Sequence, residues 1–169
     1  MKGQGMVPAF FIWCSTMTLS HLKTVCGIAA IGMLVMACGV TRAQQLPVLT
    51  LKAGMHLIHA EVAHTPDTRS RGLMFRESLG ANQGMLFVFE GAGRHCMWMR
   101  NTLIPLSVAF FSADGTIVNI ADMQPRSEQT HCAVREVQHA LEMDKGWFAA
   151  RGIKAGSRIL GIEKAPGPR

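Results

Sequence analysis

The feature that most constrains the fold is a turn signal set between two short apolar runs. Asp114-Gly115 follows Leu106–Ser112 and precedes Thr116–Ala121. An Asp-Gly pair readily adopts the backbone conformation of a tight hairpin turn, so the two runs are predicted to form paired antiparallel strands. Runs this short, joined by a turn this tight, favour a β-sheet over a bundle of helices.

Other short runs extend the β pattern on both sides of this hairpin. Apolar and polar residues alternate in Leu57–Ala63, and Met85–Phe89 is continuously apolar but too short for a typical helix. About eight strands are therefore expected, in an all-β sandwich or barrel. The remaining strands are predicted at Val48–Leu51, Cys96–Arg100, His139–Met143 and Ser157–Ile162, with a turn at Glu90–Gly93 and a polar loop at Pro125–Glu136.

Two short helices are expected between the strands. Thr65-Pro66-Asp67 supplies a hydroxyl N-cap, a proline at the first helical position and a carboxylate in the first turn, so a helix should run to about Leu73 or Phe75. Residues 144–151 can form one or two further turns, because Gly152 stands where a helix commonly ends.

An uncharged apolar run, Val25–Val40, lies upstream of these elements. Lys23 precedes it, and small residues lead to an exit at Ala43, which together predict a secretory signal peptide over residues 1–43. Residues 44–169 should then form a single exported β-rich domain, periplasmic or elsewhere in the cell envelope. Two alternatives remain: lipidation at Cys38 and an uncleaved amino-terminal anchor. Only these would attach the chain to a membrane.

The charge pattern argues against a nucleic-acid-binding domain. Of the 17 basic residues, Lys2, Lys23 and Arg42 precede residue 44, which leaves 14 basic and 11 acidic residues, a balance of +3. Their signs alternate along the chain, whereas nucleic-acid binders usually show a clustered basic stripe. The sequence also lacks spaced zinc-type cysteine pairs, a glycine-rich phosphate loop and a Gly-x-Ser-x-Gly elbow, so no cofactor is predicted.

Cys96 and Cys132 are the only cysteines after residue 43. Thiols of exported domains tend to be oxidised, so a disulfide between these two residues is predicted. The alternative is a pair of buried free thiols, because free cysteine packs as a small hydrophobic residue.

A series of motifs resembles a known family. The motifs are Arg69-Ser-Arg-Gly-Leu-Met-Phe-Arg76, Gly84–Phe89, Trp98–Thr102, Pro105-Leu106, Asp114-Gly115, Leu141-Glu142 with Gly146, and Gly152–Gly156. In this order they resemble the family catalogued as domain of unknown function 192, over about residues 52–163. The resemblance implies a compact β-sandwich of jelly-roll type in an exported bacterial protein, with no established reaction. Ser107 and Ser157 depart from the family, which often has aspartate at these positions.

Glu142 is the most informative carboxylate, because it lies in an apolar strand between Leu141 and Met143. A buried carboxylate must be paired or protonated, since unpaired burial of its charge costs several kcal/mol. The candidate partners are Arg69, Arg76 and Arg100. Glu142 is therefore a general acid or ligand anchor with a perturbed pKa, or one half of a structural ion pair, or it simply faces the solvent.

Trp98–Thr102 forms a second candidate site. Trp98, Arg100, Asn101 and Thr102 offer an aromatic plate, a guanidinium, an amide and a hydroxyl, and ligand sites commonly combine such groups. The alternative is structural, because Asn101 and Thr102 are also good turn residues and a tryptophan often lies in the core.

Soft ligands of the copper(I) type gather in His95–Met99 and His131-Cys132. Strand alternation points Met97 and Met99 away from Cys96, and a disulfide would consume both thiols, so no metal site is predicted.

The function that these observations favour is an exported, envelope-located binding or accessory module. Its ligand would be an unidentified small molecule or saccharide. The alternative is an enzyme that uses Glu142 as a general acid or base, on a polysaccharide for example, because glycoside hydrolysis needs only two carboxylates. A soft-metal-binding protein ranks third.

Overall fold

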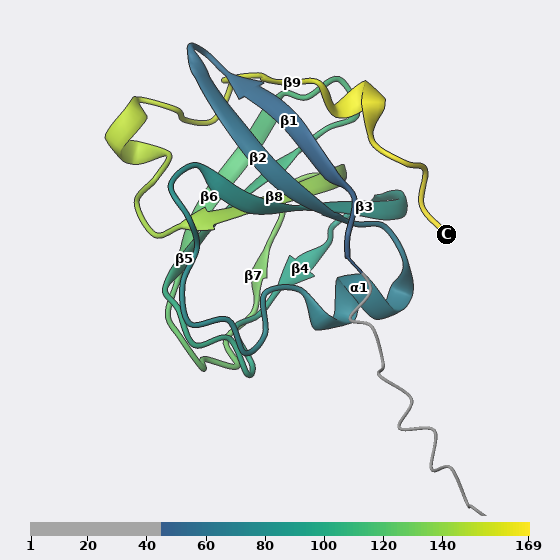
Figure 1. Ribbon diagram of the computed structural model, residues 1–169. Coiled ribbons are helices and arrows are strands. Elements are labelled where there is room, and N and C mark those ends of the chain that lie inside the picture. Colours follow the sequence, from purple (N-terminus) through teal and green to yellow (C-terminus); the bar gives the residue numbers. More distant parts are fainter. Residues whose placement is uncertain (1–44) are drawn as a thin grey trace, which may run out of the picture. The chain divides into compact units, whose positions relative to one another are not determined.

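A computed structural model describes residues 45–169 (Figure 1). The expected signal peptide or anchor at residues 1–43 lies outside the described residues. The described part confirms the all-β fold class. Its elements in chain order are β1 (Val48–Ala53), β2 (His56–Ala63), α1 (Pro66–Arg71), β3 (Gln83–Gly93), β4 (Cys96–Met97), β5 (Leu106–Phe111), β6 (Ile117–Met123), β7 (His131–Cys132), β8 (Val137–Asp144), η1 (Ala149–Arg151), β9 (Ile159–Leu160) and η2 (Ile162–Lys164).

Seven strands form one curled sheet in the order β6-β5-β8-β3-β2-β1-β9, and β4 pairs with β7 in a separate two-stranded ribbon. All pairs are antiparallel except β2 with β3, which run parallel. The sheet is a single curled layer that contains a parallel pair. The jelly-roll form implied by the family resemblance is therefore not confirmed.

The segments around β6 and β9, the first and last strands in this order, contact each other beside the Asp114-Gly115 turn. Ile117 N donates a hydrogen bond to Ser157 O at 2.8 Å, and Ile159 N donates to Gly115 O at 2.8 Å. Gly115 has a φ of 84°, and a Cβ atom there would collide with the carbonyl oxygen of Ile159. The glycine of the Asp-Gly turn thus permits both the hairpin and the closure of the sheet into a barrel.

The alternation of side chains divides the buried residues between two cores. One core fills the inside of the curl and contains Leu51, Ile58, Leu86, Phe111, Leu141 and Phe148, among others. The other lies on the outer face of β3, β5 and β8 and contains Leu73, Met85, Phe87, Met97, Met99 and Phe110, among others. We call these the barrel core and the outer core. All residues named for the two cores lie within residues 45–169, which belong to one compact unit.

The ribbon of β4 and β7 carries the predicted disulfide. Cys96 lies directly opposite Cys132, and their sulfur atoms are bonded, with the two Cα atoms 3.9 Å apart. Both cysteines are exposed. Met97 and Met99 face the outer core while Trp98 is exposed, so the predicted alternation of this segment is confirmed.

Four sequence-based element predictions were wrong. The strand expected at Cys96–Arg100 is limited to Cys96–Met97. The expected turn at Glu90–Gly93 is the end of β3, where the pairing with β8 shifts register between Val88 and Gly93. The expected loop at 125–136 contains β7, because the disulfide holds its backbone against β4. The last strand is limited to Ile159–Leu160, since the chain then turns into η2.

The helix start at Thr65 is confirmed, and the helix is shorter than expected. The side chains and backbone of Thr65 and Thr68 exchange hydrogen bonds in a capping box. Gly72 ends α1 after Arg71, rather than at Leu73 or Phe75, because its φ of 47° is incompatible with a continuing helix. Within residues 45–169, no helix has the length and apolar character needed to cross a membrane.

Candidate functional site

Glu142 is buried in β8, on the face of the sheet that carries the outer core. Its side chain is 4% exposed, and its cross-strand neighbours are Met85 of β3 and Val108 of β5. This apolar surrounding raises the pKa of Glu142 from its usual 4.5 to about 8, because burial penalises the charged carboxylate. Glu142 is therefore mostly protonated and neutral at pH 7.

The three expected arginine partners of Glu142 are engaged elsewhere. Arg69 forms an ion pair with Glu90, and Arg76 forms one with Glu61. Arg100 is exposed and lies over the ring of Trp98, 5.6 Å from its centroid. The burial of Glu142 rules out the solvent-facing alternative, and the expected ion pair is not formed among the described residues.

A second carboxylate lies on the same row of the sheet as Glu142. Glu61 of β2 stands opposite Met85, which in turn stands opposite Glu142. Two strand spacings separate the two acids, or about 10 Å between their backbones. The buried Met85 lies between them, and Glu142 lines neither of the two cavities described below.

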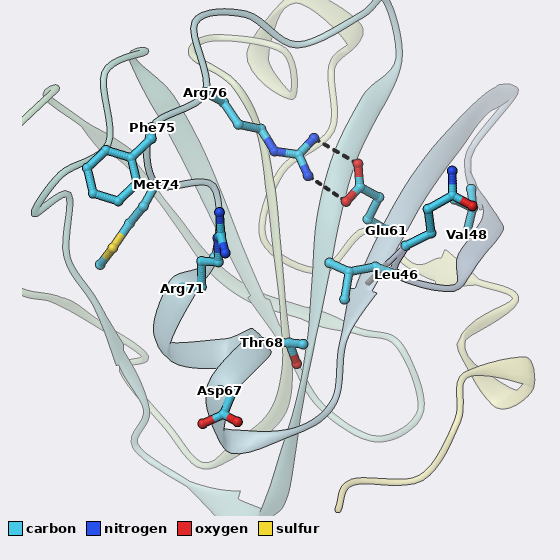
Figure 2. A pocket seen from close by; sticks show the side chains of 11 residues that line it. Leu46, Val48, Glu61, Asp67, Thr68, Arg71, Met74, Phe75 and Arg76 are labelled. Atoms are coloured by element: carbon cyan, nitrogen blue, oxygen red, sulfur yellow. Dashed lines mark hydrogen bonds and ion pairs between the residues drawn. The ribbon is translucent and has the colours of Figure 1, made fainter. Parts of the chain in front are cut away.

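A groove of about 770 Å³ lies between α1 and the start of the described chain (Figure 2). We call it the α1–β2 groove. Its lining residues are Gln45, Leu46, Val48, Glu61, Asp67, Thr68, Arg71, Gly72, Met74, Phe75 and Arg76. Helix α1 supplies one wall and residues 45–48 the facing wall, with Glu61 of β2 between them.

Two guanidinium groups of the groove differ in their partners. Arg76 donates from both terminal nitrogens to the two carboxylate oxygens of Glu61, at 2.7 and 2.5 Å. Arg71, in the last turn of α1, is exposed, and Figure 2 shows no polar contact from it to the other residues drawn. Asp67 points away from it at the other end of the helix. Arg71 is thus available to a ligand.

Phe75 stands at the rim of the groove in an uncommon backbone conformation. Its φ is 64°, and its side chain is 62% exposed. A bulky residue with a left-handed backbone is an outlier that persists only when its surroundings hold it in place. Its backbone N–H donates to Asn101 O at 2.9 Å. This hydrogen bond joins two separate motifs of the sequence, Arg69–Arg76 and Trp98–Thr102.

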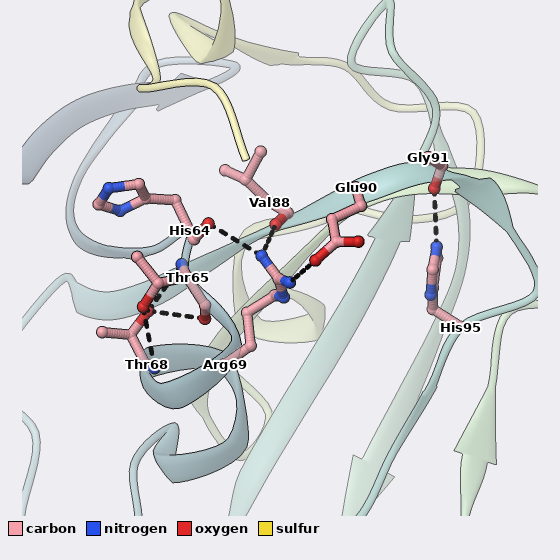
Figure 3. Close-up of polar contacts among 8 residues, drawn as sticks. All are labelled: His64, Thr65, Thr68, Arg69, Val88, Glu90, Gly91 and His95. Carbon is pink, nitrogen blue, oxygen red and sulfur yellow. Dashed lines mark hydrogen bonds and ion pairs between the residues drawn. The ribbon is translucent and has the colours of Figure 1, made fainter. Parts of the chain in front are cut away.

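Arg69 belongs to a structural cluster on the other side of α1 (Figure 3). It donates to His64 O at 2.9 Å and to Val88 O at 3.2 Å, and it bonds the Glu90 carboxylate at 2.6 Å. The Arg69 side chain is only 15% exposed. It therefore connects α1 with the end of β2 and with β3. Nearby, His95 bonds Gly91 O through Nε2 at 2.9 Å.

This arrangement predicts different outcomes for two arginine substitutions. Arg69→Met should lower the free energy of unfolding by about 2–3 kcal/mol, because it leaves two carbonyls and a carboxylate without their charged donor. Arg76→Met should cost at most about 1 kcal/mol, since its ion pair is partly solvated. Urea unfolding of both variants measures the difference, and an equal or reversed ranking would contradict it.

The other predicted site residues lie near the groove but do not line it. Trp98 is 44% exposed and so is not a core residue, and Asn101 occupies a turn with a φ of 59°. Thr102 is buried, and its backbone N–H donates to Met99 O at 2.9 Å. The ligand-binding roles of Arg69, Arg76, Trp98, Arg100, Asn101, Thr102 and Glu142 remain predictions.

Sequence reasoning missed the groove residues Arg71, Met74 and Phe75. Their signal was present in the sequence: an arginine one turn after Asp67, then a glycine, then three apolar residues beyond the end of the helix. Exposure of these apolar side chains depends on where Gly72 ends α1, which residue type alone did not settle.

Ser107 is one of the two positions where the family often has aspartate, and here a neighbouring strand supplies a carboxylate beside it. Its hydroxyl donates to the Asp122 carboxylate directly across the β5–β6 pair at 2.5 Å, and accepts from Gly146 N at 2.8 Å. Ser107 and Asp122 line a second, smaller cavity of about 410 Å³. Asp122 thus supplies a carboxylate beside the position where the family often carries one.

Comparison with known proteins supports the resemblance seen in the sequence. The family model DUF192, described as an uncharacterized ACR, matches residues 48–161. A solved structure of a protein of unknown function from Novosphingobium aromaticivorans DSM 12444 is 34% identical, with a TM-score of 0.65, and the match covers 68% of this chain and 85% of that one. A structure from Sinorhizobium meliloti 1021, described as a candidate transcription regulator, is 33% identical, with a TM-score of 0.64. This match covers 68% of this chain and 92% of that one. No curated protein matches the chain.

Proposed function

Because this chain belongs to the DUF192 family, whose description assigns no activity, we propose from its structure that it is an exported binding module with its ligand site in the α1–β2 groove. One observation carries the proposal: the guanidinium of Arg71, which has no polar partner among the groove residues drawn, stands in the same groove as the exposed ring of Phe75 (Figure 2). The volume of the groove falls in the range of small-ligand sites, which is roughly 300–1,000 Å³.

The lining of the groove indicates the chemistry of its ligand. A guanidinium binds carboxylate and phosphate groups through two parallel hydrogen bonds. The charge of Arg76 is balanced by Glu61, which leaves Arg71 as the anchor for an anion. Leu46, Val48 and Phe75 provide apolar walls. The ligand is therefore a small molecule with an anionic group next to an apolar or aromatic part.

The disulfide supports the exported location. Cys96 and Cys132 are both exposed, so a reducing compartment would have ready access to their bond. Disulfides persist mainly in oxidising environments such as the periplasm and the cell surface. This compartment agrees with the signal peptide predicted from the sequence.

The enzymatic alternative has less support from the structure. A general acid must lie within reach of its substrate, and Glu142 lies among apolar side chains, outside both described cavities. A DNA-binding function, by analogy with the Sinorhizobium relative, also lacks support. Two of the arginines in the 69–76 motif are held in ion pairs, so the motif does not form a free basic stripe.

The dye 1-anilinonaphthalene-8-sulfonate is a suitable test ligand, because it combines an anion with aromatic rings. We expect saturable binding at one site, and about tenfold weaker binding by Arg71→Ala, the effect of losing one charged hydrogen-bonding partner. Octanoate, a carboxylate on an apolar chain, should displace the dye. Fluorescence titration measures both effects.

The matched control is Arg135→Ala, which removes an exposed arginine outside the groove. It should bind the dye as the unsubstituted protein does. The dye also binds partly unfolded proteins, so circular dichroism and a cooperative unfolding transition must match among the variants. Equal affinities of the Arg71 and Arg135 variants would refute the groove as the site.

A further inference from the structure

Three loops at the groove end of the domain share an uncommon backbone feature. Within residues 45–169, four residues other than glycine have a positive φ, and three of them are Phe75, Asn101 and Arg126. Phe75 N donates to Asn101 O at 2.9 Å, and Arg126 N donates to Thr102 O at 3.0 Å. These hydrogen bonds join the loops to one another. Such backbone outliers gather at ligand clamps and other functional sites.

We call the exposed face of residues 74–76, 98–103 and 124–127 the three-loop surface. It presents three large apolar side chains: Phe75, Trp98 and Leu103, which are 62%, 44% and 36% exposed. It also presents the exposed guanidinium groups of Arg100 and Arg126. Only Phe75 and its neighbours Met74 and Arg76 also line the groove, so most of this surface lies outside the proposed ligand site.

We propose that the three-loop surface docks the domain onto a membrane that carries anionic phospholipids. Arginine binds the headgroup phosphate, and tryptophan and phenylalanine lie favourably at the level of the headgroups. Leu103 distinguishes this partner from a saccharide, because an aliphatic side chain gains from contact with acyl chains but does not stack on a sugar ring. This inference goes beyond the proposed function, which concerns a small ligand in the groove.

The position of the three-loop surface on the chain also favours a membrane. Gln45 and Leu46 line the groove together with Phe75. Only residues 41–44 separate Gln45 from the uncharged run Val25–Val40, so at most about 20 Å of extended chain lies between that run and the groove. A segment that is expected to enter a membrane, during export or as an anchor, is thus joined to a groove residue by only a few residues.

The local charges nearly balance. The exposed arginines at this end are Arg71, Arg100 and Arg126, and the exposed acids are Asp67, which lines the groove with Arg71, and Glu77 and Glu128 beside the loops. We therefore expect apolar contact and phosphate binding to act together, with only moderate weakening by salt.

Residues 44–169 and vesicles of defined composition provide the test. We expect these residues to sediment with phosphatidylglycerol vesicles at least tenfold more strongly than with phosphatidylcholine vesicles. Trp98 and Trp147 are the tryptophans in this part, and Trp147 is already buried. A shift of fluorescence to shorter wavelength on binding should therefore come from Trp98.

Two pairs of variants test the surface itself. Trp98→Ser combined with Leu103→Ser should weaken sedimentation about tenfold, whereas Met55→Ser combined with Leu57→Ser, exposed apolar residues at the other end of the β1–β2 hairpin, should leave it unchanged. Arg100→Gln combined with Arg126→Gln should reduce the preference for phosphatidylglycerol. Lys52→Gln combined with Arg135→Gln is the charge-matched control.

The outcomes separate this inference from the proposed function. Trp98 and Leu103 do not line the groove, so their variants should still bind the anilinonaphthalene dye. Dye binding without sedimentation would overturn the membrane inference alone. Equal losses in the test and control pairs would also overturn it. So would release of the bound domain by alginate, because that would identify an anionic polysaccharide as the preferred partner.

Discussion

Glu142→Gln is expected to remove a loss of stability that the unsubstituted protein suffers at alkaline pH. Between pH 4.5 and pH 9 the free energy of unfolding of the unsubstituted protein should fall by about 4 kcal/mol relative to that of the variant. In the folded protein the pKa of Glu142 is about 8, against its usual 4.5. The folded state therefore holds a proton that the unfolded state releases as the pH rises above 4.5. Stability contributed by the protonated carboxyl falls progressively from pH 4.5 to 8 and then levels off.

Urea unfolding of both proteins at pH 5, 7 and 9 measures this effect. Subtracting the two curves removes contributions from other groups, such as His139, whose pKa is lowered by burial and which destabilises the fold at acidic pH. Glu136→Gln, at an exposed carboxylate just before β8, is the matched control and should leave the pH dependence unchanged. Parallel curves for the Glu142 variant at all three pH values would show that the carboxyl is ionised in the folded protein.

This behaviour is informative about the role of Glu142. A carboxyl that is neutral at pH 7 and packed between Met85 and Val108 acts as a polar group inside the outer core. Glu142→Met should therefore fold, and should lose the same pH dependence as the glutamine variant. If either variant abolished dye binding in the α1–β2 groove while remaining folded, Glu142 would have a functional role that its position does not indicate.

The second large effect concerns the disulfide. The variant with Cys96→Ser and Cys132→Ser should lose roughly 3–4 kcal/mol of stability, because the bond closes a loop across a sequence separation of 36 residues and restricts the unfolded chain. This loss corresponds to a fall of about 10–20 °C in Tm for a domain of this size. It is a large share of the roughly 5–15 kcal/mol that stabilises a typical domain.

Thermal unfolding of the unsubstituted protein with and without dithiothreitol gives the control. Reduction should bring its Tm close to that of the double serine variant, and the variant itself should not respond to the reductant. Ser127→Ala, in the same segment of the chain, should leave the response to dithiothreitol intact. A Tm that does not change on reduction would mean that the ribbon of β4 and β7 is held by its other contacts.

The parts of the fold that depend on neighbouring residues were predictable from the sequence. The Asp114-Gly115 hairpin, the alternation in β2 and the helix start at Thr65 are confirmed, because each follows from local turn chemistry or side-chain period. The parallel pairing of β2 with β3 was not predicted, and the sequence did not decide between a sandwich and a barrel. Both depend on which distant strands meet, and the residue pattern of a single strand does not specify its partner.

In the candidate site too, local features were predictable and contacts between distant segments were not. The disulfide followed from residue type and context, whereas the sequence left open whether Glu142 is buried or faces the solvent. The partners of Arg69 and Arg76 did not, because Glu90 and Glu61 reach them only after β3, β2 and α1 have packed together. Phe75 was missed for a similar reason. Its exposure results from a left-handed backbone held by Asn101, 26 residues further along the chain.

The closure of the sheet has a consequence for the behaviour of the protein at high concentration. An open sheet ends in strands whose free N–H and C=O groups can recruit strands from other copies, which is a route to aggregation. Here β6 and β9 would be those terminal strands, and the hydrogen bonds of Gly115 and Ile117 with residues 156–159 join them. The short carboxyl-terminal segment thus covers the Asp-Gly turn and the start of β6, and its loss would lengthen the strand edge on which such association starts.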